Sequence, residues 1–186
     1  TGKQALIDRA GMCVFRCHDA WDRWPEIGIG DSWAAWLGLT RRIARDAAGY
    51  CSLYEIDPVP LGRFGAAVSA ACRPLGQHGV QVIGEMGKSI RRPAIGTGCA
   101  VPDADLVAAG ADVIVATYDG ASQWQMRHRL CDLGVSLVCL EHGTSEKPGM
   151  MNLAKYLERT FAGLSATYVD ADPPVWSVGV GGEKPG

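Results

Sequence analysis

The sequence predicts a single α/β domain over residues 1–178, with a mainly parallel sheet layered with helices in β-α-β units. Three observations lead to this fold class. Short apolar runs alternate with segments of helical period, which is typical of β-α-β units. A chain of 186 residues is long enough to bury a sizeable core as one large domain. The glycine-rich, polar end at 179–186 is expected to be a disordered tail.

The first half of the chain is expected to begin with a short helix that leads into a strand. The run "MCVFRC" at 12–17 is apolar enough for a strand buried on at least one face. Trp33, Trp36 and Leu37 follow the i, i+3, i+4 spacing of an amphipathic helix, so we expect these tryptophans to contribute to the core. The expected elements are a helix at 3–9, a strand at 12–17, a helix at 30–39, a strand at 50–56, a helix at 61–75 and a strand at 80–86.

The second half alternates strands and helices more regularly. Strands separated by single helices of this length make parallel β-α-β units. The expected elements are a strand with a glycine turn at 92–100, a helix at 103–110, a strand at 110–117, a helix at 121–133, a strand at 135–140, a helix at 150–162 and a closing strand at 164–172.

Composition excludes several classes of function. The net charge of −2 gives no broad basic surface, so no nucleic-acid partner is expected. The seven cysteines form no C-x-x-C pair and several have apolar neighbours, which predicts free thiols in a reducing cytoplasm. No apolar run approaches the roughly 18 residues of a membrane span, and no leader opens the chain, so no membrane association is expected. A chain that begins without Met suggests that something upstream is missing.

Two distant stretches share one pattern. "LIDRAGMCVFRCHDAWD" and "LCDLGVSLVCLEHGTSE" each run from a helix end through glycine and an apolar strand to a histidine and, four residues later, a carboxylate. These pairs are His18 with Asp22 and His142 with Glu146. Ligands bind at the carboxyl ends of strands in open α/β sheets, so the four side chains converge if the strands are neighbours. Imidazole and carboxylate together favour Zn, Mn or Fe, and a carboxylate can bridge two ions.

A structural interpretation of the second pair stays open. Thr144 or Ser145 could cap a helix that has Pro148 in its first turn, with Glu146 complementing the helix dipole. Other motifs are weak: no complete G-x-G-x-x-G and no phosphate-binding loop exist, so no cofactor-binding residues are predicted. Gly96 and Gly98 are expected to let the chain turn tightly beside the site. The remaining histidines, His78 and His128, are expected in a loop and on a solvated helix face.

At these residues the sequence resembles the Ngg1-interacting-factor-three-like family of dinuclear-metal hexameric proteins, also labelled type-2 GTP cyclohydrolase I homologues. The resemblance covers roughly residues 4–176. The family's H-x-N-x-D strand end resembles "CHDAWD", its glycine turn resembles "GTGCA", its "GADV" is matched at 110–113, and its G-H-x-x-[ST]-E resembles "EHGTSEKPG". This chain departs from the family pattern at Asp19, Ala20 and Glu141.

The resemblance implies a metal site and an assembly. Carried onto this sequence, the family's metal ligands fall on Asp22, His142 and Glu146, with His18 lining the cavity. It implies a divalent transition metal, Zn, Mn or Fe, at two ions per subunit in a full-length chain. The family's remaining ligands belong to an N-terminal segment that this sequence lacks, so we expect one weakly held ion here. The resemblance also implies a toroidal homo-oligomer, the hexamer of the family, with an unknown small-molecule ligand.

Two functions follow from these observations. The first is a metal-dependent hydrolase acting on a nucleotide or phosphate-like small molecule, with His18 or Glu141 placed for proton transfer. The second is a non-catalytic, metal-stabilised oligomeric ring that binds a protein or a small molecule.

Overall fold

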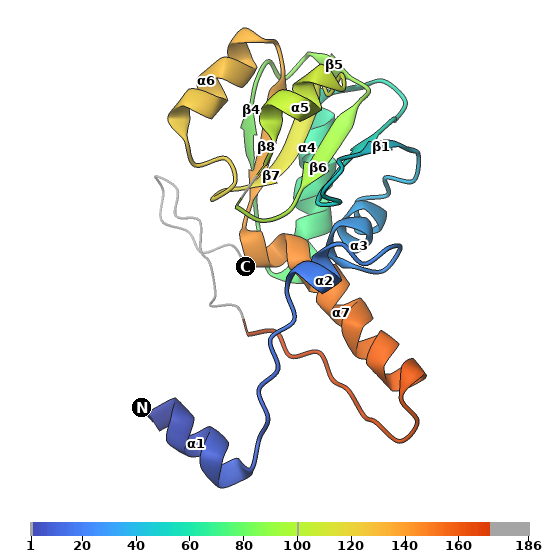
Figure 1. Cartoon of the computed structure of the whole chain (residues 1–186). Helices are drawn as coiled ribbons and strands as arrows, with labels where there is room; N and C mark the ends of the chain where they lie inside the picture. Colours follow the sequence, from blue (N-terminus) through green and yellow to red (C-terminus); the bar gives the residue numbers. More distant parts are fainter. Residues whose placement is uncertain (1, 100, 172–186) are drawn as a thin grey trace.

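The computed structural model describes residues 2–99 and 101–171, and it confirms an α/β fold (Figure 1). Helices and strands occur in the order α1 Gly2–Ala10, α2 Asp19–Asp22, α3 Ile29–Trp36, β1 Arg42–Arg45, β2 Cys51–Tyr54, β3 Val59–Pro60, α4 Leu61–Cys72, the 3-10 turn η1 Arg73–Leu75, β4 Gln81–Ile83, β5 Ser89–Ile90, β6 Pro93–Gly96, α5 Asp103–Ala108, β7 Val113–Thr117, α6 Trp124–Asp132, β8 Ser136–Leu140 and α7 His142–Thr160. Most expected elements are therefore present near their expected positions.

The main sheet has the strand order β1-β2-β6-β7-β8-β4, and β3 pairs separately with β5. Only the central pairs, β6 with β7 and β7 with β8, are parallel. The outer pairs β1–β2, β2–β6 and β4–β8 are antiparallel, so the expectation of a mainly parallel sheet is wrong. Strand direction depends on the segment that connects two strands. Helix α5 connects β6 to β7 and α6 connects β7 to β8, and such crossovers allow parallel pairing, whereas a short loop joins the antiparallel strands β1 and β2.

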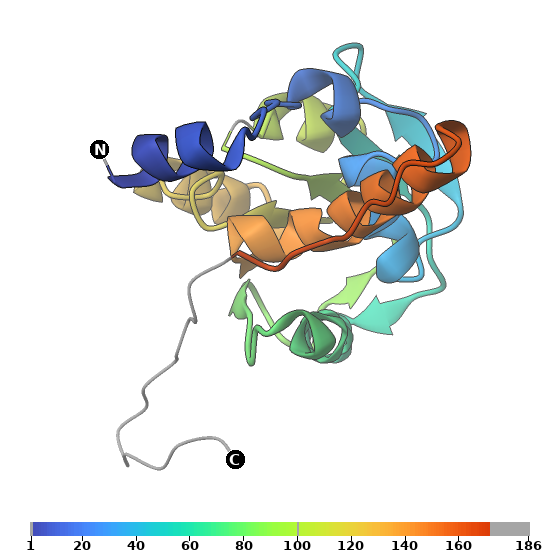
Figure 2. The same ribbon diagram turned by 90° about the horizontal axis from the view of Figure 1, so that it is seen from below.

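The core lies on both faces of this sheet. One face packs Val113, Val115 and Val138 against α3 and α4, and the other packs Ile114 and Leu137 against α5 and α6. Figure 2 shows α4 on one side of the strands and α5 on the other. Because both faces are covered, β7 and β8 are buried at every position and appear in the sequence as continuous apolar runs.

The expected strand at 12–17 is absent. This segment is irregular and exposed, with Phe15 85% exposed, and helix α1 before it has no buried residue. Figure 1 shows α1 standing apart from the α/β body. A strand needs a neighbour for its backbone groups, and none of the described strands pairs with 12–17.

The end of the chain also differs from expectation. Helix α7 begins at His142, well before the expected 150, and continues through Pro148. Its N-cap is Glu141 with no side-chain cap, while the Ser145 hydroxyl donates to the His142 carbonyl at 2.7 Å, so the helix-cap interpretation is wrong. Residues 164–171 form no strand, and the tail at 179–186 lies outside the described residues.

In the part of the chain that the structure describes, no helix is both long and apolar enough to cross a membrane.

Candidate metal centre

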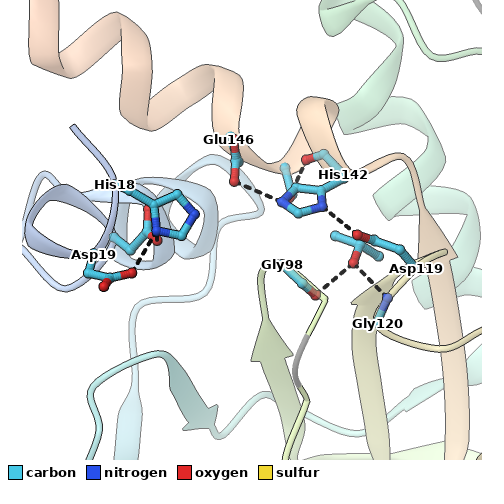
Figure 3. Close-up of polar contacts among 10 residues, drawn as sticks. His18, Asp19, Gly98, Asp119, Gly120, His142 and Glu146 are labelled. Atoms are coloured by element: carbon cyan, nitrogen blue, oxygen red, sulfur yellow. Dashed lines mark hydrogen bonds and ion pairs between the residues drawn. The ribbon is translucent and has the colours of Figure 1, made fainter. Parts of the chain in front are cut away.

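The candidate site lies where the three parallel strands end. The segments that follow β6, β7 and β8 carry Gly98, Asp119 and His142, and these three residues meet at one edge of the sheet (Figure 3). The cavity at this edge has a volume of about 310 Å³. Its lining consists of His18, Asp19, Asp22, Tyr50, Thr97, Gly98, Cys99, His142 and Glu146.

His142 and Glu146 come from the start of α7. Because they are four residues apart, they lie on the same helix face, and His142 Nε2 is 2.9 Å from Glu146 Oε1. The glycine turn lies beside the ring: Gly98 has φ +85°, and a Cβ there would lie 3.9 Å from His142 Nε2. The expected tight turn beside the site is therefore confirmed for Gly98, whereas Gly96 is the last residue of strand β6 and has no positive φ.

Asp119 completes the surroundings of His142. Its Oδ2 lies 2.7 Å from Nδ1 of His142, on the side of the ring opposite Glu146. The sequence prediction missed this residue. A signal was available, because Asp119 follows the buried run of β7 by two positions, as polar site residues do in α/β sheets.

The other side of the cavity is built by α2. His18 Nδ1 lies 2.6 Å from Asp19 Oδ1 and 3.7 Å from Asp22 Oδ2. Ligand atoms of these three residues all fall within 4.8 Å of one another, a spacing that could hold a metal ion. Trp21 fixes α2 against α7, since it is buried and its indole N–H donates to the Gly149 carbonyl at 3.0 Å.

The electrostatics of the two sides reflect these contacts. The hydrogen bond with Asp19 and the charge of Asp22 raise the pKa of His18. Burial raises the pKa of Asp22, although the charge of His18 opposes the shift. Burial alone would raise the pKa of Asp119, but its interactions with Thr117 and His142 outweigh burial and lower it. Each side thus pairs an imidazole with carboxylates, a donor set that suits a divalent transition metal.

Four of the five predicted site residues line the cavity, and Glu141 does not. Asp22, His142 and Glu146, the predicted metal ligands, all line it, together with His18. They belong to two facing groups: among the described residues, His18, Asp19 and Asp22 form a cluster of three with mutually close ligand atoms, and His142 and Glu146 form a separate close pair. Glu141 does not line the cavity; its backbone N–H donates to the Gln77 side chain at 3.1 Å, at the start of α7.

Comparison with known proteins identifies the family. The family model described as Duf34/NIF3 (NGG1p interacting factor 3) matches residues 4–173. The chain belongs to this family. Asp22, His142 and Glu146 all lie within the matched range, as does Asp119. A comparison with curated proteins finds no match.

Solved structures show the same fold for the NIF3-family chain. It is similar to the Staphylococcus aureus hypothetical protein SA1388, with a TM-score of 0.76, 18% identity, and coverage of 93% of this chain and 71% of that one. It also resembles protein ybgI, of unknown function, with a TM-score of 0.72, 22% identity and 87% of this chain covered. Reduced HcgD from Methanocaldococcus jannaschii matches 86% of this chain with a TM-score of 0.65 and 16% identity. The chain spans only 62% of the length of ybgI and 62% of that of HcgD.

Proposed function

We propose that this NIF3-family protein is a metal-dependent hydrolase that acts on a nucleotide or another phosphate-like small molecule. One observation carries the proposal: two imidazole–carboxylate groups from segments more than 120 positions apart face each other across a cavity of about 310 Å³. Ordinary ion pairs on the surface have no reason to line the same cavity, whereas the two halves of a binding site do. At about 310 Å³ the cavity lies at the lower end of the roughly 300–1,000 Å³ range of ligand pockets, which leaves room for a metal and the phosphate end of a nucleotide.

The residues around the cavity fit a divalent transition metal. Asp22, His142 and Glu146 would hold it, and Asp19 beside Asp22 offers a further carboxylate donor. Zn, Mn and Fe suit mixed imidazole and carboxylate donors, whereas Ca and Mg prefer oxygen alone. A bound ion would polarise a phosphoryl oxygen and make a water molecule a stronger nucleophile near neutral pH. The proposal of two ions per subunit applies to a full-length chain.

His18 is the best placed of the proposed proton-transfer residues. Its Nδ1 is held by Asp19 at 2.6 Å, which orients the ring and leaves Nε2 for a group in the cavity. The side chain of His18 is 63% exposed, so it can exchange protons with solvent. Glu141, the other predicted proton-transfer residue, lies away from the cavity lining, so the proposed mechanism does not use it.

A turnover assay tests this function. The metal-loaded protein is offered a panel of nucleotides and phosphoesters, and we expect metal-dependent hydrolysis that Glu146→Gln abolishes. His128→Ala is the matched control, because His128 packs edge-on against Trp124 on α6 at 5.0 Å between ring centroids, away from the cavity lining. Absence of turnover in a wild-type protein that binds metal would contradict the hydrolase and favour the non-catalytic ring.

We also propose that the protein assembles with copies of itself, as a hexameric ring in line with the family resemblance. Supporting this proposal, the first 17 residues expose Leu6, Met12, Val14 and Phe15, each by more than half. Exposed apolar side chains that gather in a patch often mark a protein interface. The same observation supports the alternative of a metal-stabilised ring that binds a protein or small-molecule partner without catalysis.

A further inference from the structure

We propose that Asp119 is a positioning residue that selects the nitrogen of His142 that faces the metal. The inference rests on the proposed metal function, and it assigns a role to a carboxylate that would not itself be a ligand. Its basis is the geometry around the imidazole ring, which lies between Asp119 and Glu146 (Figure 3).

The two ring nitrogens of His142 have different neighbours. Nδ1 is 2.7 Å from Asp119, on the side away from α7, and Nε2 is 2.9 Å from Glu146, on the side of the cavity. A neutral imidazole carries one proton, so only one of these contacts can have the ring as donor. When the proton is on Nδ1 and is donated to Asp119, the lone pair of Nε2 remains available to a cation.

The other tautomer would inactivate the site. A proton on Nε2 would be donated to Glu146, and the two proposed ligands of α7 would then satisfy each other. Neither that Nε2 nor the bonded oxygen of Glu146 would be free for a cation. Asp119 therefore disfavours the hydrogen bond from His142 Nε2–H to Glu146, which the i, i+4 spacing of these two residues makes possible.

The end of β7 holds Asp119 in place. Thr117 is fully buried, and its hydroxyl donates to the Gly98 carbonyl at 2.9 Å and accepts from the Gly120 N–H at 3.2 Å. These bonds join the β7 loop to the glycine turn that lies beside His142. They hold the backbone on either side of Asp119, and the contact with Nδ1 of His142 orients the carboxylate itself.

The first test measures the tautomer of His142 in metal-free protein by ¹⁵N NMR, at a pH where the ring is neutral. We expect Nδ1–H in the wild type and a shift to Nε2–H in Asp119→Ala. Asp119→Asn offers an amide NH₂ that can donate to Nδ1 while Glu146 accepts from Nε2–H, so it should also favour the Nε2–H form. An unchanged tautomer in Asp119→Ala would overturn the proposal, whatever the protein does with metal.

The second test measures zinc affinity by competition with a chromophoric chelator. Loss of a carboxylate behind a ligating histidine weakens metal binding by roughly 10- to 100-fold, and we expect this for Asp119→Ala. Asp103→Asn is the control, because it also removes one negative charge. Asp103 lines the adjacent polar cavity with Asp119 but pairs with Arg129, so the zinc affinity of this variant should match that of the wild type.

The two tests separate the failure of each proposal. A wild type that binds no zinc would contradict the metal function, while the tautomer measurement would still decide the role of Asp119. If Asp119→Ala lost zinc as completely as Glu146→Gln without any change of tautomer, Asp119 would be a direct ligand and the positioning role would be wrong. Asp119 has a side chain that is 46% exposed, so its replacement should leave the fold intact, which thermal unfolding checks.

Discussion

His142 lies between the carboxylates of Asp119 and Glu146, and this makes its protonation a contributor to stability. Burial lowers its pKa, but the hydrogen bond with Asp119 and the charge of Glu146 outweigh burial, so the pKa lies above the ordinary 6.5. A raised folded-state pKa means that protonation stabilises the fold. This contribution is fully present below the unfolded pKa near 6.5 and is lost as pH rises through the folded value.

We therefore expect the stability difference between wild type and His142→Gln to be larger below pH 6.5 than in alkaline solution. Urea unfolding of both proteins with a chelator present measures it across the range. A difference that did not change with pH would contradict the prediction. Because a proton and a metal compete for Nε2, zinc affinity of the wild type should rise over the same interval.

The cysteines should divide into two reactivity classes. Burial raises the pKa of Cys51 and Cys72 to about 12, and it also raises the pKa of Cys139. A thiol reagent should leave these buried groups unmodified until the protein unfolds, since the thiolate is the reactive form. The exposed thiols are expected to react in the folded state; they are Cys13, Cys17, Cys99 and Cys131.

Cys99 provides a local check on the site, because it lines the candidate metal cavity whereas Cys131 does not. Zinc should therefore slow the labelling of Cys99 relative to that of Cys131. Mass spectrometry of the labelled peptides measures both rates. Equal rates with and without zinc would argue against metal binding in this cavity.

At the scale of elements, the contact of α7 with α3 and α2 positions the two sides of the site. A Cβ at Gly149 would lie 2.7 Å from the Cα of Ile29, a backbone atom of α3 that cannot move aside easily. The carbonyl of Gly149 also accepts the indole N–H of Trp21 on α2. Any separation of α3 from α7 should therefore disturb α2 and the residues that it carries, His18 and Asp22.

We expect Gly149→Ala to lower the free energy of unfolding by about 1–3 kcal/mol, the usual effect of an overpacked core, and to weaken zinc binding. Gly79→Ala is the control, since a Cβ there meets nothing within 4 Å. Urea unfolding and chelator competition measure the two effects. If both variants behaved alike, the close approach of α7 to α3 would not be what positions α2.

At the scale of the whole molecule, the N-terminal residues stand apart from a well-packed body. Phe15 is 85% exposed and Val14 69% exposed, so their side chains contribute little to the stability of the isolated chain. We expect Phe15→Ser to reduce self-association, as measured by sedimentation velocity, with little effect on urea unfolding. A variant that unfolded more easily would show that Phe15 packs within its own subunit. A monomeric wild type at micromolar concentration would contradict the proposed assembly.

Local sequence determined the central part of the molecule. Val113–Thr117 and Ser136–Leu140 are buried on both faces, and such strands are continuous apolar runs that can be recognised without knowledge of their neighbours. The helix between them, α6, was expected from the alternation of strands and helices. His18, Asp22, His142 and Glu146 were found because each pair follows an apolar run at the same spacing, and all four line one cavity. The resemblance of these motifs led to the correct family.

Only the tertiary structure decided the features that depend on distant partners. Residues 12–17 have the apolar composition of a strand, yet they remain exposed because no described strand lies beside them to accept their backbone hydrogen bonds. The outer strands are antiparallel because strand direction depends on how the chain returns to the sheet, which composition does not reveal. Asp119 and His142 are 23 positions apart, and their contact exists only because β7 and β8 pair in parallel and end at the same edge.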